Sequence, residues 1–269
     1  MKKFAVIVAG GLGMRMGAAV PKQFLLLRGY PVLWYTLETF LNAYEDLQIV
    51  LVVPVGYEEE AKASIGFLPA GGRVVMVTGG DTRFHSVRNG LAWIRRKVAE
   101  GDGLGAAASE GKVGQEVTER KVGQEATETK VGLEATGAEA GRDTIVFVHD
   151  GVRCLVSADL IRRCYEQAVE LGSAVPVVDC RDSVRLVDDV RRSKPIDRSR
   201  IKMVQTPQTF RGDILLGAYT LDHQEAFTDE ATVVEVAGHE VHLIEGEQTN
   251  IKITTPEDMV LAEVLLGRQ

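Results

Sequence analysis

The chain has 269 residues, 45% of them hydrophobic and 26% charged, which is enough for one large α/β domain or two small ones. Its net charge of −7 argues against a nonspecific nucleic-acid binder, so an anionic ligand must be attracted by a local cluster of Arg and Lys. The N-terminal apolar run is too short to span a membrane, and the three cysteines lack metal-ligand spacing, so we expect a cytoplasmic protein with reduced thiols.

A glycine-rich turn follows the first predicted strand. Residues 4–8 are an apolar run typical of a buried parallel strand, and residues 9–17 contain four glycines and an arginine, with Lys22 shortly after. Backbone N–H groups and two cations suit a polyphosphate. Met16 stands where a dinucleotide fingerprint needs its third glycine, and Pro21 precedes Lys22, so neither that fingerprint nor a P-loop fits. A merely connecting turn is the alternative, and the two cations favour phosphate binding.

Strands and helices then alternate. Apolar runs predict strands over residues 4–8, 47–53, 74–77, 144–148 and 173–178. Apolar side chains at intervals of three and four predict helices over residues 31–44, 57–65, 84–98 and 157–171. Ser157 is expected to cap the last of these. The alternation predicts a parallel, doubly wound α/β sheet, in which ligands bind beyond the carboxyl ends of the strands.

The repetitive segment at residues 101–142 has a different composition. A nine-residue unit at residues 112–120 recurs at 121–129 and, in degenerate form, at 130–138. A solenoid is a possible interpretation. However, the segment has no aromatic residue, contains a glycine in every unit and is rich in acidic residues, so it cannot bury enough apolar surface to offset its ordering entropy. We expect a disordered insertion without catalytic residues, within one domain spanning residues 1–269.

The C-terminal part begins with alternating polar and apolar residues. Residues 182–187 and 200–205 are predicted to pair as a half-exposed antiparallel ribbon. Because an isolated ribbon is marginal in water, we expect it to pack on a second subunit. The remaining predictions are helices over residues 212–221 and 228–237, the second capped by Thr228, strands over 241–244 and 251–253, and a terminal helix capped by Thr255.

The polar residues at strand ends and turns suit nucleotidyl transfer. No local signature of a Ser–His–Asp or Cys–His pairing is present, and His149 is interpreted as structural. A phosphate monoester has a second pKa of about 6, so it can attack near neutral pH without a general base. Catalysis then depends on positioning and on cations around the phosphates. The available cations are Arg15 and Lys22 for the triphosphate, and Arg198 and Lys252 for the incoming phosphate.

Asp150 is expected directly after the strand at residues 144–148. A carboxylate at such a strand end can hold Mg²⁺ directly or through water. Pairing with Arg153 is an alternative of comparable weight.

Several motifs, taken together, resemble the 2-C-methyl-D-erythritol 4-phosphate cytidylyltransferases. The resemblance covers essentially the whole chain except residues 101–142. The matching motifs are residues 9–16, 21–23, 79–86, 149–153, 181–183, 205–208, 228–231 and 250–254.

The resemblance implies a Rossmann-like nucleotidyltransferase fold, with a mostly parallel twisted sheet, helices on both faces and a protruding β-ribbon arm over residues 183–205 that joins a homodimer. It implies transfer of CMP from CTP to 2-C-methyl-D-erythritol 4-phosphate in isoprenoid precursor biosynthesis, with release of pyrophosphate. Mg²⁺ or another divalent cation would be the cofactor, and no nucleic-acid or membrane partner is expected.

The resemblance also implies three groups of site residues. The catalytic group is Arg15, Lys22, Arg198 and Lys252. The nucleotide-binding group is Ala9, Gly10, Gly11, Leu12, Gly13, Gly80, Asp81 and Ser86. The acceptor-binding group is Asp150, Arg153, Ser183, Thr206 and Thr228, in which Ser183 and Thr206 are expected, together with Arg198, to reach the neighbouring subunit's substrate.

The chain departs from the family pattern at three places. Gly151 and Val152 stand where the family commonly has two alanines, Ser183 stands where a threonine is common, and the repeat segment is atypical. The alternatives are a cytidylyltransferase for another polyol phosphate such as ribitol 5-phosphate, a sugar-1-phosphate uridylyl- or guanylyltransferase, and a noncatalytic CTP-sensing module.

Overall fold

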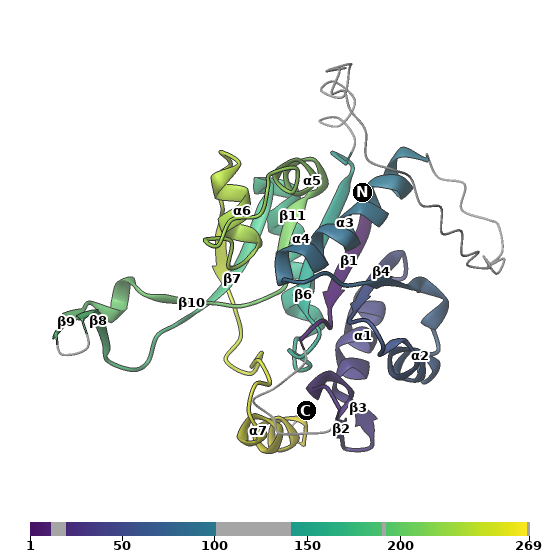
Figure 1. Cartoon of the computed structure of the whole chain (residues 1–269), viewed down its shortest axis with the longest axis horizontal. Helices are drawn as coiled ribbons and strands as arrows, with labels where there is room; N and C mark the ends of the chain where they lie inside the picture. The colour runs from purple at the N-terminus through teal and green to yellow at the C-terminus, as the bar shows by residue number, and fades with distance from the viewer. Residues whose placement is uncertain (12–19, 101–140, 190–191, 268–269) are drawn as a thin grey trace, which may run out of the picture.

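The structure, a computed structural model, describes residues 1–11, 20–100, 141–189 and 192–267. An eight-stranded sheet forms its centre, with strands in the order β10-β7-β11-β6-β1-β4-β5 and β12 pairing with β7 (Figure 1). The strands are β1 (Lys2–Val8), β4 (Leu47–Val53), β5 (Val74–Thr78), β6 (Thr144–Asp150), β7 (Ser173–Asp179), β10 (Lys202–Val204), β11 (Gln208–Arg211) and β12 (Leu243–Glu245). Strands β6, β1, β4 and β5 are parallel, whereas β11 runs antiparallel between β6 and β7.

Helices cover both faces of this sheet, because its central strands are apolar on both sides. Ala5 and Ile7 of β1 face one hydrophobic cluster, while Phe4 and Val6 face the other. The first cluster includes side chains of α1 (Val32–Ala43), α2 (Glu58–Gly66) and α4 (Ala158–Leu171). The second includes side chains of α3 (Arg83–Ala99), α5 (Gly212–Ala218) and α6 (Glu230–Val236). The predicted fold class is confirmed.

A third, smaller hydrophobic cluster includes residues that directly follow the carboxyl end of β6. It joins the hairpin β2 (Leu26–Leu27) and β3 (Tyr30–Pro31) to the C-terminal helix α7 (Pro256–Leu266), and it includes Val152 and Ile253. Thr255 begins α7 with a capping box, and Ser157 caps α4, as predicted. Through this cluster the segment that carries Lys252 is held against the segment that follows β6.

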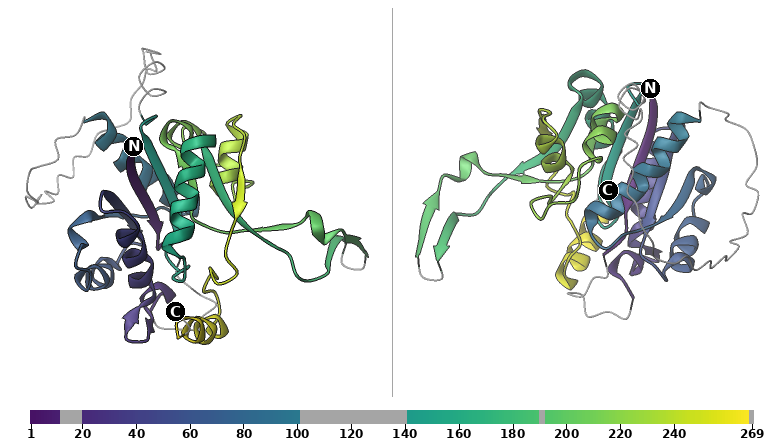
Figure 2. Two further views of the ribbon diagram at one scale, coloured as in Figure 1. Left: turned by 180° about the vertical axis from the view of Figure 1, so that it is seen from behind. Right: turned by 45° about the horizontal axis from the view of Figure 1, so that its top comes forward.

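A two-stranded arm projects from the sheet (Figures 1 and 2). It is formed by β8 (Val184–Asp189) and β9 (Arg192–Ile196), followed by the 3-10 turn η4 (Arg198–Arg200). The predicted ribbon is therefore present, but the prediction that residues 200–205 form its second strand is wrong. Instead, β10 pairs with β7 in the main sheet, with Met203 opposite Val178. The alternating pattern at residues 200–205 reflects a sheet edge and not the arm.

Three smaller expectations are corrected. Residues 251–253 form no strand. They lie in a loop, in which Ile253 N donates to Val152 O at 3.0 Å. Asp229, and not Thr228, caps α6 by accepting from the N–H of Thr232. The strand expected over residues 241–244 begins at Leu243. Most of the repeat segment lies outside the described residues. Within the described ranges, no helix is long and apolar enough to cross a bilayer.

Candidate active site

Two cavities meet at the carboxyl ends of β1 and β6, where Val8 and Asp150 are paired in register. The larger has a volume of about 420 Å³ and the smaller about 230 Å³. Arg83, Asp150 and Lys252 line both cavities. The expected nucleotide-binding residues that the structure describes all line the larger one: Ala9, Gly10, Gly11, Gly80, Asp81 and Ser86. The smaller one is lined by four expected acceptor residues: Asp150, Arg153, Thr206 and Thr228.

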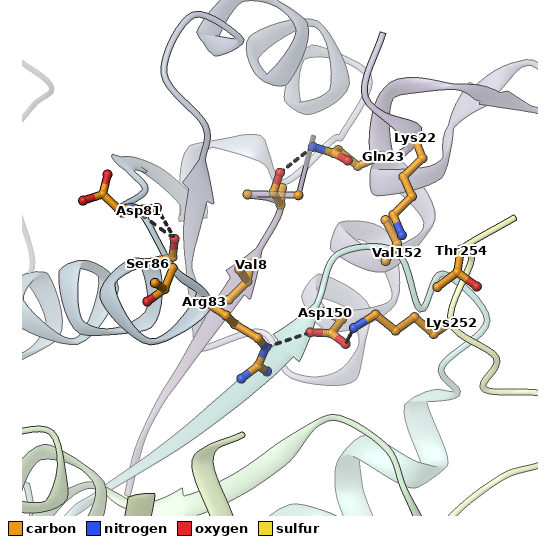
Figure 3. Close-up of a pocket in the computed structure, with 15 residues that line it drawn as sticks. Val8, Lys22, Gln23, Asp81, Arg83, Ser86, Asp150, Val152, Lys252 and Thr254 are labelled. Atoms are coloured by element: carbon orange, nitrogen blue, oxygen red, sulfur yellow. Dashed lines mark hydrogen bonds and ion pairs between the residues drawn. The ribbon is translucent and has the colours of Figure 1, made fainter. Parts of the chain in front are cut away.

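The turn between β5 and α3 forms one wall of the larger cavity. The hydroxyl of Ser86 accepts a hydrogen bond from Gly80 N at 3.1 Å, which fixes the turn (Figure 3). A Cβ at Gly80 would lie 2.5 Å from Cβ of His85, so only glycine fits there. Thr82 caps α3 by accepting from His85 N, so the N-terminal end of that helix borders the cavity. Helix N-termini favour anions, which suits a nucleotide wall.

Lys22 forms the opposite wall. It begins the short 3-10 helix η2 (Lys22–Phe24), is 9% exposed and lines the larger cavity. The neighbouring Gln23 donates a hydrogen bond to the carbonyl of Ala9, which ties η2 to the end of β1. In Figure 3 the Lys22 ammonium lies on the same side of the cavity as Lys252, across from Asp81. Arg15, Leu12 and Gly13, the other expected members of this loop, lie outside the described residues.

Asp150 lies at the junction of the two cavities, between Arg83 and Lys252 (Figure 3). Its Oδ1 accepts from Arg83 Nε at 3.3 Å, and its Oδ2 lies 2.8 Å from Lys252 Nζ and 3.7 Å from Arg153 Nε. Burial alone would raise the pKa of Asp150, but the charges of Arg83 and Lys252 hold it well below its usual range. Asp150 is therefore ionised, and the expected Asp150–Arg153 pairing is one part of a larger cluster.

Thr206 lines the smaller cavity and is hydrogen-bonded to the buried side chain of His149. His149 is fully buried, and burial lowers its pKa to about 3, so the ring is neutral at pH 7. Its Nε2 lies 3.2 Å from the carbonyl of Arg153, which can only accept, so Nε2 carries the proton. Nδ1 then accepts from the Thr206 hydroxyl at 3.0 Å, and that oxygen accepts from Asp150 N. His149 is thus structural, as interpreted from sequence.

Thr206 lies at the smaller cavity, whereas Ser183 and Arg198 lie on the arm. Thr206 is 5% exposed and lines its own chain's cavity, so the expectation that it reaches a neighbouring subunit is wrong. Ser183 and Arg198 are exposed on the arm and line neither cavity. Arg198 Nη1 donates to the carbonyl of Arg181 at 2.7 Å. Within one chain, the structure therefore does not bring these two residues to the site.

Sequence reasoning gave no role to two charged residues beside Asp150. Arg83 makes a bidentate ion pair with Glu230 of α6, through Nη1 at 2.5 Å and Nη2 at 2.9 Å. Both positions belong to matching motifs, and that was the only signal in the sequence. Their contact joins residues separated by 147 positions, a distance that no local pattern reveals.

A divalent cation finds few protein ligands here. Among the residues that the structure describes, no group of three His, Cys, Asp or Glu side chains is arranged to hold a metal. Both oxygens of Asp150 already face cations, so it is a poor direct ligand. Mg²⁺ commonly takes one or two carboxylates, water and substrate phosphates as ligands. The residues present therefore fit Mg²⁺ only together with a bound polyphosphate, and direct ligation by Asp150 alone is not supported.

Known proteins match this chain over nearly its full length. The family model for 2-C-methyl-D-erythritol 4-phosphate cytidylyltransferase matches residues 4–126 and 121–268. The protein of that name from Phocaeicola vulgatus is 37% identical, over 99% of this chain and 100% of the relative, and that from Bacteroides thetaiotaomicron is 38% identical with the same coverage. The crystal structure of the Thermus thermophilus protein of that name matches with a TM-score of 0.64 and 28% identity, over 98% of each chain.

The fold, the residues of the two cavities and the sequence relatives all indicate the same family. The two cavities hold the described residues that the family resemblance assigns to the nucleotide and, apart from Ser183 of the arm, to the acceptor. The matches to these relatives cover 99% of this chain and therefore extend beyond the motifs. The chain belongs to the 2-C-methyl-D-erythritol 4-phosphate cytidylyltransferase family.

Proposed function

We propose that the protein transfers CMP from CTP to 2-C-methyl-D-erythritol 4-phosphate and releases pyrophosphate, in isoprenoid precursor biosynthesis. Family membership supports the two substrates. The observation that carries the proposal is the pair of cavities that meet at Asp150, with the expected nucleotide residues in one and the expected acceptor residues in the other. Two substrates placed there would meet at the junction, which is what direct transfer requires.

The reaction needs charge stabilisation more than proton transfer. A phosphate oxygen of the acceptor attacks the α-phosphorus of CTP, a new P–O bond forms, and the bond from the α-phosphorus to the bridging oxygen breaks to give pyrophosphate. Lys22, with Arg15 from the glycine-rich loop, stabilises the charge that gathers on the α-phosphate oxygens. Near neutral pH the attacking phosphate is largely ionised. His149 is fully buried and hydrogen-bonded at both nitrogens, so it is not the base.

Lys252 and Arg153 bind the acceptor phosphate, and Asp150 and Thr228 hold its polyol part. Lys252 is 42% exposed and pairs with Asp150 at 2.8 Å, so its ammonium can turn from Asp150 toward an incoming phosphate. A divalent cation such as Mg²⁺ would supply neutralisation of phosphate charge when bound with the triphosphate. Because Asp150 is already paired with Arg83 and Lys252, it would contribute little to holding that cation.

A homodimer completes the site through the arm. Arg198 and Ser183 lie on an exposed arm whose Leu186 and Val187 are 44% and 64% exposed. An isolated ribbon with such side chains gains stability by packing on a second copy. We propose that Arg198 and Ser183 contact the acceptor bound by the partner. All three cysteines are free thiols, which supports the cytoplasm as the compartment.

Pyrophosphate release with a panel of substrates tests the function. CTP is paired in turn with 2-C-methyl-D-erythritol 4-phosphate, ribitol 5-phosphate and a sugar 1-phosphate, and UTP replaces CTP in a parallel series. We expect the highest kcat/KM for CTP with methylerythritol phosphate. A clear preference for ribitol phosphate, or for UTP, would contradict the proposal, and CTP binding without pyrophosphate release would indicate a sensor.

A further inference from the structure

The ion pair Arg83–Glu230 lies at the junction of the two cavities, where Arg83 lines both and Glu230 is buried. Glu230 is 0% exposed, and both its oxygens accept from the two terminal nitrogens of Arg83. The hydroxyl of Tyr219 donates to Glu230 Oε1 at 3.1 Å. Burial and the nearby Glu230 charge raise the pKa of Tyr219 well above its usual value, so the hydroxyl keeps its proton and donates.

This pair leaves Arg83 only one edge to offer the cavities. Nη1 and Nη2 are engaged by Glu230, and Nε donates to Asp150 Oδ1 at 3.3 Å. The guanidinium is planar, so fixing two nitrogens by a bidentate pair also fixes the direction of the third N–H. Asp150 thereby receives a hydrogen bond of set direction from Arg83.

Glu230 is itself rigidly held. Its helix α6 is capped by Asp229, which also accepts from Gln208 Nε2 at 3.0 Å, while Gln208 Oε1 accepts from Ala231 N at 2.8 Å. Behind Arg83, the Phe84 ring stacks on Tyr219 with centroids 4.8 Å apart. The start of α3, which borders the nucleotide cavity, and the start of α6, which borders the acceptor cavity, are joined through this pair.

We propose that Glu230, assisted by Tyr219, is a positioning residue that orients Arg83 and through it the acceptor-binding carboxylate of Asp150. The inference rests on the proposed function, which assigns Asp150 to the polyol phosphate. Because Asp150 faces Arg83 with one oxygen and Lys252 with the other, a loosened Arg83 lets the carboxylate rotate toward Lys252. The acceptor then loses a correctly placed oxygen, while the Lys22 side of the nucleotide cavity is unchanged.

Steady-state kinetics of matched variants test this role. Glu230→Gln keeps the shape of the side chain and removes its charge, and Tyr219→Phe removes only the hydroxyl that supports it. Tyr35→Phe is the control, because Tyr35 lies on α1, its hydroxyl donates to the carbonyl of Leu27 in β2, and neither residue lines either cavity. We expect Glu230→Gln to raise KM for the acceptor about tenfold, the factor that corresponds to one charge-assisted hydrogen bond, with KM for CTP within about twofold. Tyr219→Phe should change the same constant in the same direction by a smaller factor.

The split between the two KM values separates positioning from stability. A merely structural Glu230 would lower the melting temperature and leave both KM values unchanged, and a general distortion would raise both equally; either result overturns the inference. If Glu230→Gln does not fold, Tyr219→Phe decides alone: an acceptor KM equal to that of Tyr35→Phe refutes the role. Wild-type turnover is measured first, because its absence would overturn the proposed function and this inference with it. An active wild type with unchanged acceptor KM in the variants overturns this inference only.

Discussion

Replacing Lys22 by methionine should reduce kcat strongly and leave the fold intact. Lys22 is 9% exposed, so its ammonium acts in a region with little water between it and the phosphates. At about 4 Å and an effective dielectric constant of about 20, a unit charge interacts with another by about 4 kcal/mol. Since about 1.4 kcal/mol corresponds to a tenfold change in rate, kcat should fall by about 10² to 10³.

The assay for Lys22→Met is pyrophosphate release with saturating CTP and acceptor. Methionine keeps most of the stem volume, so the melting temperature should change little. Lys62→Met is the control, because Lys62 is an exposed lysine of α2 that pairs with Glu59 and lines neither cavity. A Lys22→Met enzyme with near wild-type kcat would refute the argument that this cation stabilises the transition state.

Three further predictions concern the arm, the junction and the buried histidine. If Arg198 acts on the partner's substrate, mixing the inactive variants Arg198→Ala and Lys252→Ala should restore up to about a quarter of wild-type activity in mixed dimers, whereas cis action restores none. Asp150→Asn leaves neighbouring cations without their counter-charge, so the free energy of unfolding should fall by about 3 kcal/mol in denaturant titrations, and an unchanged value would contradict the cluster. The folded pKa of His149, about 3, lies below its unfolded value, so only the unfolded chain gains this proton as pH falls below about 6.5. Stability should therefore drop by about 2 kcal/mol between pH 7 and pH 5 in denaturant titrations, and an equal loss in His149→Gln would contradict this assignment.

Buried elements were predictable from sequence, because continuous apolar runs have few alternatives. Residues of β1, β4 and β6 are buried on both faces, and their predicted ranges match closely. The pairing of the edge strand β10 was not predictable. The alternating pattern at β10 suits an arm as well as a sheet edge, and its pairing with β7 depends on a register that no local signal specifies. Ile251 and Ile253 alternate like a strand, but they pack into the cluster around α7.

The candidate site was predictable wherever a motif carried its own chemistry. Lys22, Asp150 and Lys252 were assigned from residue type and place, and the structure brings all three to one cavity. Arg83 and Glu230 were missed because their significance lies in a contact between distant parts of the chain. Thr206 was assigned to the wrong subunit because its hydrogen bond to His149 of the same chain is equally long-range.

Product identification tests the central claim most directly. The purified chain is incubated with CTP, 2-C-methyl-D-erythritol 4-phosphate and Mg²⁺, and the mixture is followed by phosphorus NMR and mass spectrometry. The account predicts equal amounts of pyrophosphate and 4-diphosphocytidyl-2-C-methyl-D-erythritol. Unchanged CTP with this acceptor, together with turnover on another polyol phosphate, would contradict it.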